Sequence, residues 1–329
     1  MKAFITGGTG FIGRHLIDFL SARDAEIIAL VRDPRKAVVF SGKKISILKG
    51  DLFALSSLPA GIDTVFHLAG KTKSLRESDY YTVNQEGTAS LFRALLSSGG
   101  RPKVVYLSSL AASGPSENET AVREDDPPHP VTSYGRSKLG GEQEALKFRD
   151  RLPLVIIRAS AIFGPLDRDF LEFFKFIGRG ILPTAAEEKH VSLCYVKDLV
   201  EALYLCAQAD LPSGEIFNIA DPTPWTWERL GEAAGKAMGK KLRRVIIPMG
   251  ILSLVTRLSE FRNRLKGEPG VFSREKYIDF MQPGWVADVS KAARVLSFRP
   301  RYDLEKAIQE TVDWYIAEKW LSGPVRRSS

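Results

Sequence analysis

The sequence predicts an α/β protein built on a doubly wound parallel sheet, with a smaller, mostly helical lobe in its C-terminal half. Two observations predict it. Short apolar runs rich in β-branched residues alternate with helical patterns through the first half of the chain. These runs are apolar throughout, which is typical of parallel strands buried on both faces. After residue 221 the pattern changes to helices with Gly, Pro and aromatic residues, which indicates the second lobe.

The elements follow in order along the chain. The predicted strands of the sheet are residues 3–6, 26–31, 45–48, 64–69, 103–108 and 154–159, with 214–220 as a further strand. The helices between them include 12–22, 79–98 and 134–149. A helix at 303–318 is expected to pack back on the first lobe. We assign the first domain to 1–165, joined by 191–221 and 303–318, and the second lobe to 166–190 and 222–300.

Composition excludes several classes of protein. The chain has 329 residues, of which 44% are hydrophobic and 26% charged, as in ordinary soluble globular proteins. Its net charge of +8 is spread along the sequence, which favours small anionic ligands over nucleic acid. Cys194 and Cys206 lie in apolar runs and are expected to be buried thiols in a reducing, cytoplasmic compartment. The four histidines lack metal-ligand spacing, so no metal site is predicted.

Membrane insertion is not expected. The chain starts directly with a strand pattern, MKAFITGG, which predicts no signal peptide. The longest apolar stretch, residues 245–258, contains Pro248 and Arg257 and is too short to span a bilayer. A core helix is the simplest interpretation of this stretch. Contact with a membrane surface or with an apolar site is the alternative.

The loop after the first strand, GGTGFIG at 7–13, is typical of a phosphate-binding turn. Gly7 and Gly10 allow a tight turn and let backbone N–H groups approach a pyrophosphate closely. Gly13 lets the following helix pack tightly on the strand, and the N-terminus of that helix then faces the anion. The sequence therefore predicts a dinucleotide site at this loop.

The end of the second strand, ALVRDP at 29–34, bears on the choice between NAD and NADP. NAD-binding folds place an acidic residue there for the ribose hydroxyls. Val31 occupies that place, and Arg32 suits a 2′-phosphate, which favours NADP. Asp33 is the alternative ribose ligand, although Asp-Pro more often begins a turn. Asp51 and Leu52 are predicted at the adenine, with a loop-capping Asp as the alternative.

Seven motifs together resemble the extended short-chain dehydrogenase/reductase family, the NAD(P)-dependent epimerase/dehydratase group. They are GGTGFIG, GDL (50–52), FHLAG (66–70), YYTVNQEGT (80–88), YLSS (106–109), YGRSK (134–138) and RASAIFGP (158–165). The resemblance covers nearly the whole chain and implies a Rossmann-type NAD(P)-binding first domain and a substrate-binding second lobe. It also implies cofactor contacts from Phe11, Ile12 and the Leu68, Ala69 and Gly70 of FHLAG. A homodimer is expected by the same analogy.

The resemblance also implies the catalytic residues. Tyr134 and Lys138 match the family's catalytic pair, lie one helical turn apart and would both contact the cofactor. We expect a Lys⁺ and an oxidised nicotinamide to lower the pKa of the tyrosine from about 10. Ser109 fits the family's S-x-x-x-x-G spacing, counted back from Gly114, and would hold the substrate oxygen, whereas Ser108 would cap the strand. Asn84 would steady the active-site helix and contact the cofactor, with simple packing as the alternative.

Three departures from the family pattern limit which of the family's reactions and substrates fit this sequence. Leu110 and Ala111 follow Ser109 where dehydratases carry an acidic pair. Ala161, a predicted substrate-binding residue with Phe163, stands where sugar-nucleotide enzymes carry Asn. Val191 stands where those enzymes carry a pyrophosphate-binding Arg, although the adjacent Lys189 and His190 are candidates to replace it. Phenylalanines at 163–176 with Trp225 and Trp227 suit an apolar site, although most are expected to be core.

We therefore expect an NADP(H)-dependent oxidoreductase that interconverts a secondary alcohol and a ketone on a small, largely apolar substrate. The alternative is a nucleotide-sugar 4-epimerase that uses tightly bound NAD. A non-catalytic NADP-sensing protein would be expected to lack Ser109, Tyr134 or Lys138, and all three are present.

Overall fold

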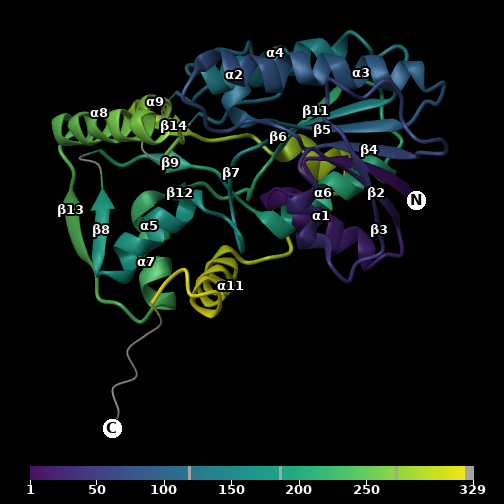
Figure 1. The fold of residues 1–329 in the computed structure, drawn as a ribbon. Helices are drawn as coiled ribbons and strands as arrows, with labels where there is room; N and C mark the ends of the chain where they lie inside the picture. The colour runs from purple at the N-terminus through teal and green to yellow at the C-terminus, as the bar shows by residue number, and fades with distance from the viewer. Residues whose placement is uncertain (118–119, 185–186, 271–272, 323–329) are drawn as a thin grey trace.

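The computed structural model describes residues 1–117, 120–184, 187–270 and 273–322, which form two lobes (Figure 1). A parallel sheet of seven strands forms the first lobe, in the order β11-β6-β5-β4-β1-β2-β3. The strands are β1 (Lys2–Thr6), β2 (Glu26–Val31), β3 (Ile45–Lys49), β4 (Thr64–His67), β5 (Lys103–Ser109), β6 (Leu154–Ala159) and β11 (Glu215–Ile219). The doubly wound parallel sheet predicted from the sequence is confirmed. The predicted strand 64–69 ends at His67 because its partner Thr6 is the last residue of β1.

Helices cover both faces of this sheet. They are α1 (Phe11–Ser21), α2 (Glu77–Tyr81), α3 (Gly87–Ser97), α4 (Ser133–Leu146) and α6 (Val196–Gln208), with short 3₁₀ turns η1 (Pro34–Phe40) and η3 (Leu110–Ala112). The predicted helix 79–98 is wrong in one respect. A π-helical turn, η2 (Thr82–Glu86), interrupts it and separates α2 from α3. Such turns are frequent at functional sites, and this one carries Asn84.

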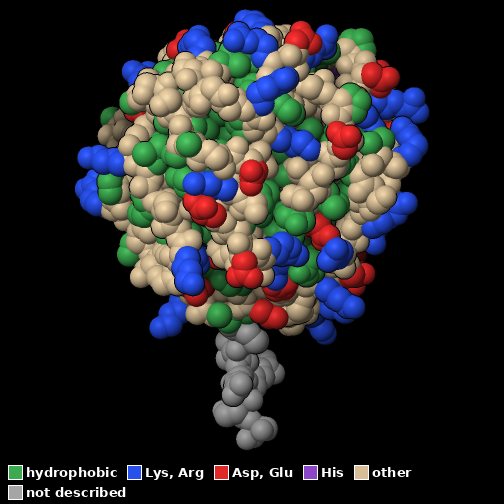
Figure 2. All heavy atoms as spheres, turned by 90° about the vertical axis from the view of Figure 1, so that its right-hand side faces the viewer, with side chains coloured by type: hydrophobic (Ala, Val, Ile, Leu, Met, Phe, Trp, Pro, Cys, Tyr) green, Lys and Arg blue, Asp and Glu red, His purple; other side chains and the backbone are tan. Residues whose placement is uncertain are grey.

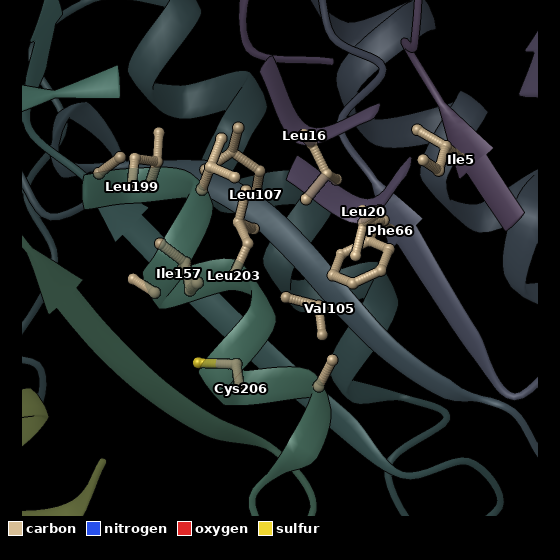
Figure 3. Packing of buried hydrophobic residues seen from close by; sticks show 14 of the residues in the cluster. Ile5, Leu16, Leu20, Phe66, Val105, Leu107, Ile157, Leu199, Leu203 and Cys206 are labelled. Carbon is tan, nitrogen blue, oxygen red and sulfur yellow. The ribbon is translucent and has the colours of Figure 1, made fainter. Parts of the chain in front are cut away.

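The core explains why the strands are apolar throughout. Successive side chains of a strand point to opposite faces of the sheet. Ile5, Val105 and Ile157 therefore pack against α1 and α6 in the cluster of Figure 3. Their neighbours Phe4 and Val104 pack on the other face with residues of α3. Both cysteines are free and buried, as predicted.

The second lobe combines helices with small sheets. Its helices are α5 (Asp169–Gly178), α7 (Trp227–Ala237), α8 (Met249–Lys266) and α9 (Arg274–Met281). Its strands are β8 (Ile181–Thr184) with β13 (Arg243–Ile246), and β9 (His190–Val191) between β12 (Trp225–Thr226) and β14 (Gly284–Trp285). A separate two-stranded parallel sheet pairs β7 (Ala161–Phe163) with β10 (Leu193–Tyr195).

Two C-terminal helices depart from the expected arrangement. We expected the helix at 303–318 on the first lobe, but α11 (Leu304–Ala317) buries Ile308 and Val312 in the second core with Leu230 of α7. Both faces of the main sheet are already covered by other helices, so the apolar face of α11 is buried elsewhere. Conversely, α10 (Ser290–Val295), expected within the second lobe, packs Ala292 into the first core beside β11.

The apolar stretch 245–258 is not a core helix. It spans the end of β13 and the first half of α8, and many of its large apolar side chains are exposed. Within the part of the chain that the structure describes, no helix is long and apolar enough to cross a membrane. On the face drawn in Figure 2, Lys and Arg side chains are interspersed with Asp and Glu.

Candidate active site

The glycine loop lies at the carboxyl end of β1, beside the point where the strand order reverses between β1 and β4. Open α/β sheets bind ligands at this point. Gly7 has φ +74°, a conformation that favours glycine, and a Cβ there would lie 2.7 Å from the backbone N of Ala69. The loop after β1 therefore touches the Leu68–Gly70 loop after β4, as a shared cofactor site requires.

Backbone N–H groups of this loop are available to an anion. Gly10 is the N-cap of α1 and makes no side-chain cap, so the first turn of the helix keeps N–H groups that can bind phosphate. A Cβ at Gly13 would lie 2.3 Å from the carbonyl oxygen of Gly7, so a larger residue would push the helix off the loop. Phe11 and Ile12 follow Gly10 and are half-buried against the second core. The geometry fits the pyrophosphate of a dinucleotide.

The adenine end of the predicted site lies beyond β2. Arg32 follows this strand directly and is exposed. Asp33 caps η1 instead of pointing freely: its Oδ1 accepts from the backbone N of Arg35 at 3.1 Å, and its carboxylate also binds the Arg35 guanidinium. Asp51 caps its own loop by accepting from two backbone N–H groups, and Leu52 is buried in the core. The turn-forming alternative for Asp33 thus has direct geometric support.

Tyr134 and Lys138 lie on the first turns of α4, which Thr132 begins by accepting from the backbone N of Gly135 at 3.0 Å. The Lys138 ammonium donates to the carbonyl oxygen of Leu107, on β5, at 2.7 Å and lies 4.5 Å from the Tyr106 ring centroid. Burial lowers the pKa of Lys138 to about 7, against the opposing effect of a nearby glutamate. Near neutral pH this lysine is therefore close to its own midpoint.

The pKa of Tyr134 is raised in the protein without cofactor, whereas we expected it to be lowered. Burial raises this pKa to about 12, a hydrogen bond with Ser109 lowers it, and the carboxylate of Asp279 raises it. Lys138 is not among the groups that shift this pKa, and its ammonium donates to the carbonyl oxygen of Leu107. The chain alone therefore does not supply the lowered pKa that we expected from Lys138.

The two serines at the end of β5 take different roles. Ser108 is buried and donates to Glu142 at 2.5 Å, and Glu142 in turn forms a buried ion pair with Arg158 at 2.7 Å. Ser109 is half-buried, caps η3 through its Oγ and lies close enough to Tyr134 to lower the pKa of its phenol. Ser109 is thus the serine that faces the tyrosine.

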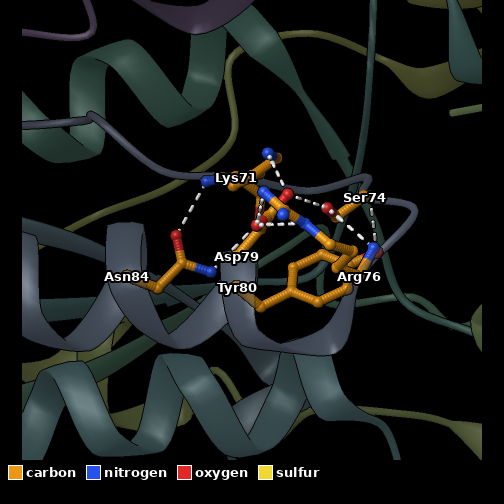
Figure 4. Close-up of polar contacts among 6 residues, drawn as sticks. All are labelled: Lys71, Ser74, Arg76, Asp79, Tyr80 and Asn84. Atoms are coloured by element: carbon orange, nitrogen blue, oxygen red, sulfur yellow. Dashed lines mark hydrogen bonds and ion pairs between the residues drawn. The ribbon is translucent and has the colours of Figure 1, made fainter. Parts of the chain in front are cut away.

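Asn84 ties the π-turn to both α4 and the loop after Gly70. Its Oδ1 accepts from the backbone N of Lys71 at 2.7 Å, and its Nδ2 donates to Ser137 Oγ at 2.9 Å. Figure 4 shows Asn84 beside a second group, in which Lys71, Ser74 and Arg76 converge on Asp79. The hydrogen bond from Lys71 is the largest cause that lowers the pKa of Asp79 to about 2. This network fixes the loop beside α4.

The second lobe approaches the tyrosine through α9, which the sequence analysis missed. Glu275 Oε2 accepts from the backbone N of Tyr134 at 3.1 Å. A pocket adjoins this contact and is lined by Lys73, Tyr80, Glu260, Asn263, Arg264 and Ser273, among others. The Tyr80 ring lies edge-on to Tyr134, with centroids 6.2 Å apart. Tyr80 begins the motif YYTVNQEGT, but no motif signals the other residues, because they come from separate segments of the chain.

Most of the predicted substrate residues lie in the core, and Ala161 is half-buried. Phe163 is completely buried and packs on Phe170 and Tyr195. Ala161 begins the same short strand and is half-buried. Phe170, Phe174 and Trp225 are also buried, as expected for core residues.

Lys189, one of the two candidate replacements for the pyrophosphate-binding arginine, is held by other contacts of the fold. Val191 is buried and pairs with Trp225 across the small sheet. Lys189 donates to the carbonyl oxygens of Phe280 and Gln282, at the end of α9, at 2.5 and 2.9 Å. Its ammonium therefore holds two segments of the second lobe together.

Comparisons with known proteins agree with this geometry. The model of the NAD dependent epimerase/dehydratase family matches residues 3–220. A ceramide reductase of Caulobacter vibrioides (strain NA1000 / CB15N) is 29% identical over 322 residues, covering 96% of this chain and 95% of that protein. A decarboxylating sterol-4-alpha-carboxylate 3-dehydrogenase of Candida albicans is 27% identical, covering 95% and 97%.

The fold also matches solved structures. A UDP-glucuronic acid 4-epimerase from Bacillus cereus, in complex with UDP-glucuronic acid and NAD, superposes with a TM-score of 0.75 at 21% identity, covering 97% of this chain and 100% of that chain. The structure of gox2253 superposes with a TM-score of 0.80 at 22% identity. These likenesses concern the fold.

Proposed function

The chain belongs to the NAD dependent epimerase/dehydratase family, as its seven motifs predict, and we propose that it is an NADP(H)-dependent oxidoreductase of a small, largely apolar substrate. Family membership makes it an NAD(P)-dependent enzyme that acts on CH–OH or C=O groups. The proposal adds the substrate class, the choice of cofactor and the residues that do the chemistry. We also propose a cytoplasmic homodimer, by analogy with the family alone.

The proposed roles follow from the contacts of each side chain. Bound, the nicotinamide accepts or supplies the hydride. Ser109 holds the substrate oxygen by a hydrogen bond and keeps it beside Tyr134. Tyr134 exchanges a proton with that oxygen through its hydroxyl. Lys138 binds the nicotinamide ribose, and Asn84 holds α4 through Ser137.

The pKa values of the pair bear on this proposal. A tyrosine with a pKa of about 12 is almost fully protonated at neutral pH, so it carries the proton that reduction consumes. That state suits reduction, in which Tyr134 gives its proton to the carbonyl oxygen. Oxidation requires an additional positive charge beside the phenol, which an oxidised nicotinamide provides.

The proposal of an apolar substrate rests mainly on one position. There this chain has Val191, whereas sugar-nucleotide enzymes carry an arginine that binds the pyrophosphate. Val191 takes its place and is buried, and Lys189 is committed to two backbone carbonyls. A sugar nucleotide would therefore lack this cationic partner at the second lobe. The names of two relatives, which denote enzymes of ceramide and of a sterol, support a lipid-like substrate for this chain.

The preference for NADP rests on the end of β2. Arg32 is exposed beside the predicted adenine site, where a guanidinium can bind a 2′-phosphate. Asp33 already accepts from the backbone and side chain of Arg35, so its carboxylate is engaged in the turn. Both observations favour NADPH over NADH.

Thermal unfolding with NADPH, NADH and UDP, singly and with each cofactor plus UDP, tests the proposal. A ligand that binds only the folded protein raises its stability by RT ln(1 + [L]/Kd). We expect a larger shift with NADPH than with NADH, and none with UDP. A clear shift with UDP, above all in the presence of NADH, would instead identify a nucleotide-sugar 4-epimerase.

A further inference from the structure

Helix α8 presents its apolar side to solvent and its polar side to the protein. Thr256 and Asn263 are buried on its inner face, and Asn263 contacts Ser259 of the same face. Six large apolar residues are 42–74% exposed on its outer face: Ile251, Leu254, Val255, Leu258, Phe261 and Leu265. A helix on the surface of a globular protein normally has the opposite arrangement. The inversion indicates that a partner covers the outer face.

The exposed residues form one continuous stripe. Their spacing of three and four residues places them on the same side of an α-helix over its whole length of 18 residues. Figure 1 shows α8 at the outer margin of the second lobe, beside α9. Contiguous apolar surface of this kind marks an interaction site, whereas scattered exposed apolar residues need no explanation.

Positive charge borders the stripe on both sides. At 100° per residue, Arg262 and Lys266 lie along one edge and Arg257 and Arg264 along the other. The only acidic residue of the helix, Glu260, is half-buried and accepts from the backbone N of Arg274 at 2.7 Å. The outer face of α8 is therefore apolar in the middle and cationic at its edges.

We propose that the outer face of α8 docks the protein on a membrane surface that contains anionic phospholipids. The stripe would enter the boundary between headgroups and acyl chains, and the four basic residues would contact phosphate groups. A second copy of the chain fits this face less well, since the four basic residues of one helix would find no free carboxylate on the other helix to pair with.

The inner side of the same helix reaches the candidate active site. Glu260 and Asn263 of the inner side, with Arg264 at the edge, line a pocket together with Tyr80, and Tyr80 contacts Tyr134. Docking on α8 would thus bring the pocket beside Tyr80 close to the bilayer. The docking itself rests on the surface of α8 and not on the proposed reaction, so its test needs no substrate.

Co-sedimentation with vesicles tests the docking. The wild-type protein is expected to bind vesicles of phosphatidylcholine mixed with phosphatidylglycerol, and to bind phosphatidylcholine alone more weakly. Leu254→Asp combined with Leu258→Asp should weaken binding at least about tenfold, because two apolar anchors become charged. Arg257→Gln with Arg262→Gln should reduce binding to the anionic vesicles and leave binding to phosphatidylcholine unchanged.

Val38→Asp is the matched control, because Val38 is an equally exposed apolar residue on η1. It should bind vesicles like the wild type, and all variants should keep the wild-type unfolding temperature because the replaced side chains are exposed. Equal binding by the stripe variant would overturn the proposal, and so would no binding of the wild type to anionic vesicles. Sedimentation velocity tests the alternative that a second copy covers this face. If the wild type is a dimer that does not bind vesicles, and the stripe variant is a monomer, the face belongs to a second copy.

Discussion

Glu275 of the second lobe accepts a hydrogen bond from the backbone N–H of Tyr134, with 3.1 Å between its Oε2 and the nitrogen. This N–H is one of the first-turn groups of α4 that have no partner within the helix. Thr132 satisfies the N–H of Gly135, and Glu275 satisfies that of Tyr134 from 141 residues away. A carboxylate at a helix N-terminus also interacts favourably with the helix dipole. The second lobe therefore helps to hold α4, which carries Tyr134 and Lys138, in place.

Replacing Glu275 should loosen that hold. We expect Glu275→Ala to destabilise the protein by about 0.5–2 kcal/mol, the usual effect of losing a helix cap. Turnover should fall about tenfold because Tyr134 is then positioned less well. Urea unfolding and NADPH oxidation with an apolar ketone measure the two effects.

Two further variants separate the hydrogen bond from other changes. Glu275→Gln keeps an acceptor and should retain most of the turnover. Arg274→Ala alters an exposed neighbour on the same helix and should leave both quantities unchanged. If Glu275→Ala turns over like the wild type, the contact holds the lobe without positioning Tyr134.

Tyr134→Phe should abolish proton transfer and leave the cofactor site intact. General acid–base catalysis contributes about 10²–10⁴-fold, so turnover should fall by that factor. The stabilisation by NADPH in thermal unfolding should be unchanged within about twofold in Kd, since the phosphate loop is untouched. Retained turnover would remove the proposed role of Tyr134.

Ser109→Ala and Ser108→Ala form a matched pair at the end of β5. Ser109 lies beside Tyr134 and lowers the pKa of its phenol, so its loss should lower turnover about 10²-fold or more without a large change in stability. Ser108 donates to the buried carboxylate of Glu142, so its loss should cost about 1–3 kcal/mol of stability and leave turnover near the wild-type value. Urea unfolding and steady-state rates on both variants decide the assignment, and the opposite pattern would identify Ser108 as the catalytic serine.

The sequence predicts local and periodic features of this molecule well. The apolar runs of the sheet are confirmed because both faces of the strands are buried, and the glycine loop follows β1 as expected. Tyr134 and Lys138 lie one turn apart on the predicted helix. Each of these features depends on neighbours in the sequence.

Features that depend on distant segments could not be predicted. The contact of Glu275 with Tyr134 joins parts of the chain that share no motif. The position of α11 depends on which apolar faces the earlier helices leave uncovered. The stretch 245–258 is apolar, and only the fold reveals that the inner face of α8 is polar and that its apolar face is exposed. The interruption of the predicted helix at Asn84 likewise follows from packing against α4.

The choice of cofactor can be tested at Arg32. Arg32→Ser should weaken NADPH binding about 10–100-fold, which corresponds to about 1.4–2.7 kcal/mol, because a charged hydrogen bond to the 2′-phosphate is lost. NADH binding should change little. Arg35→Ser is the control, because the Arg35 guanidinium is already paired with Asp33. Fluorescence titrations of both cofactors measure the ratio, and an equal loss for NADH would mean that Arg32 does not contact the 2′-position.

His67 predicts a pH dependence of stability. It is completely buried at the end of β4, between Thr6 and Thr88, and it stacks on Tyr106 with ring centroids 5.1 Å apart. Burial is the main cause that lowers the pKa of His67 to about 3, and the charge of Lys138 adds to it. In the unfolded chain a histidine titrates near pH 6.5.

Below pH 6.5 the unfolded chain therefore binds a proton at this residue that the folded protein binds only near pH 3. The free energy of unfolding therefore decreases as the pH is lowered through this window. His67 alone contributes up to about 1.4 kcal/mol of this decrease per pH unit. Asp167 and Asp198 act in the opposite direction, since burial raises the pKa of each carboxyl to about 6 and the folded protein is protonated first. A comparison of variants is needed to isolate the histidine.

His67→Gln removes the titrating group. At pH 8 this variant should be less stable than the wild type, because the hydrogen bonds with Thr6 and Thr88 are altered. Between pH 6.5 and 4.5 its stability should decrease less steeply than that of the wild type, so the two curves converge as the pH falls. His129→Gln, at an exposed histidine, should keep the wild-type slope. Urea unfolding at a series of pH values measures these slopes, and parallel curves for His67→Gln and the wild type would show that His67 is protonated in the folded protein.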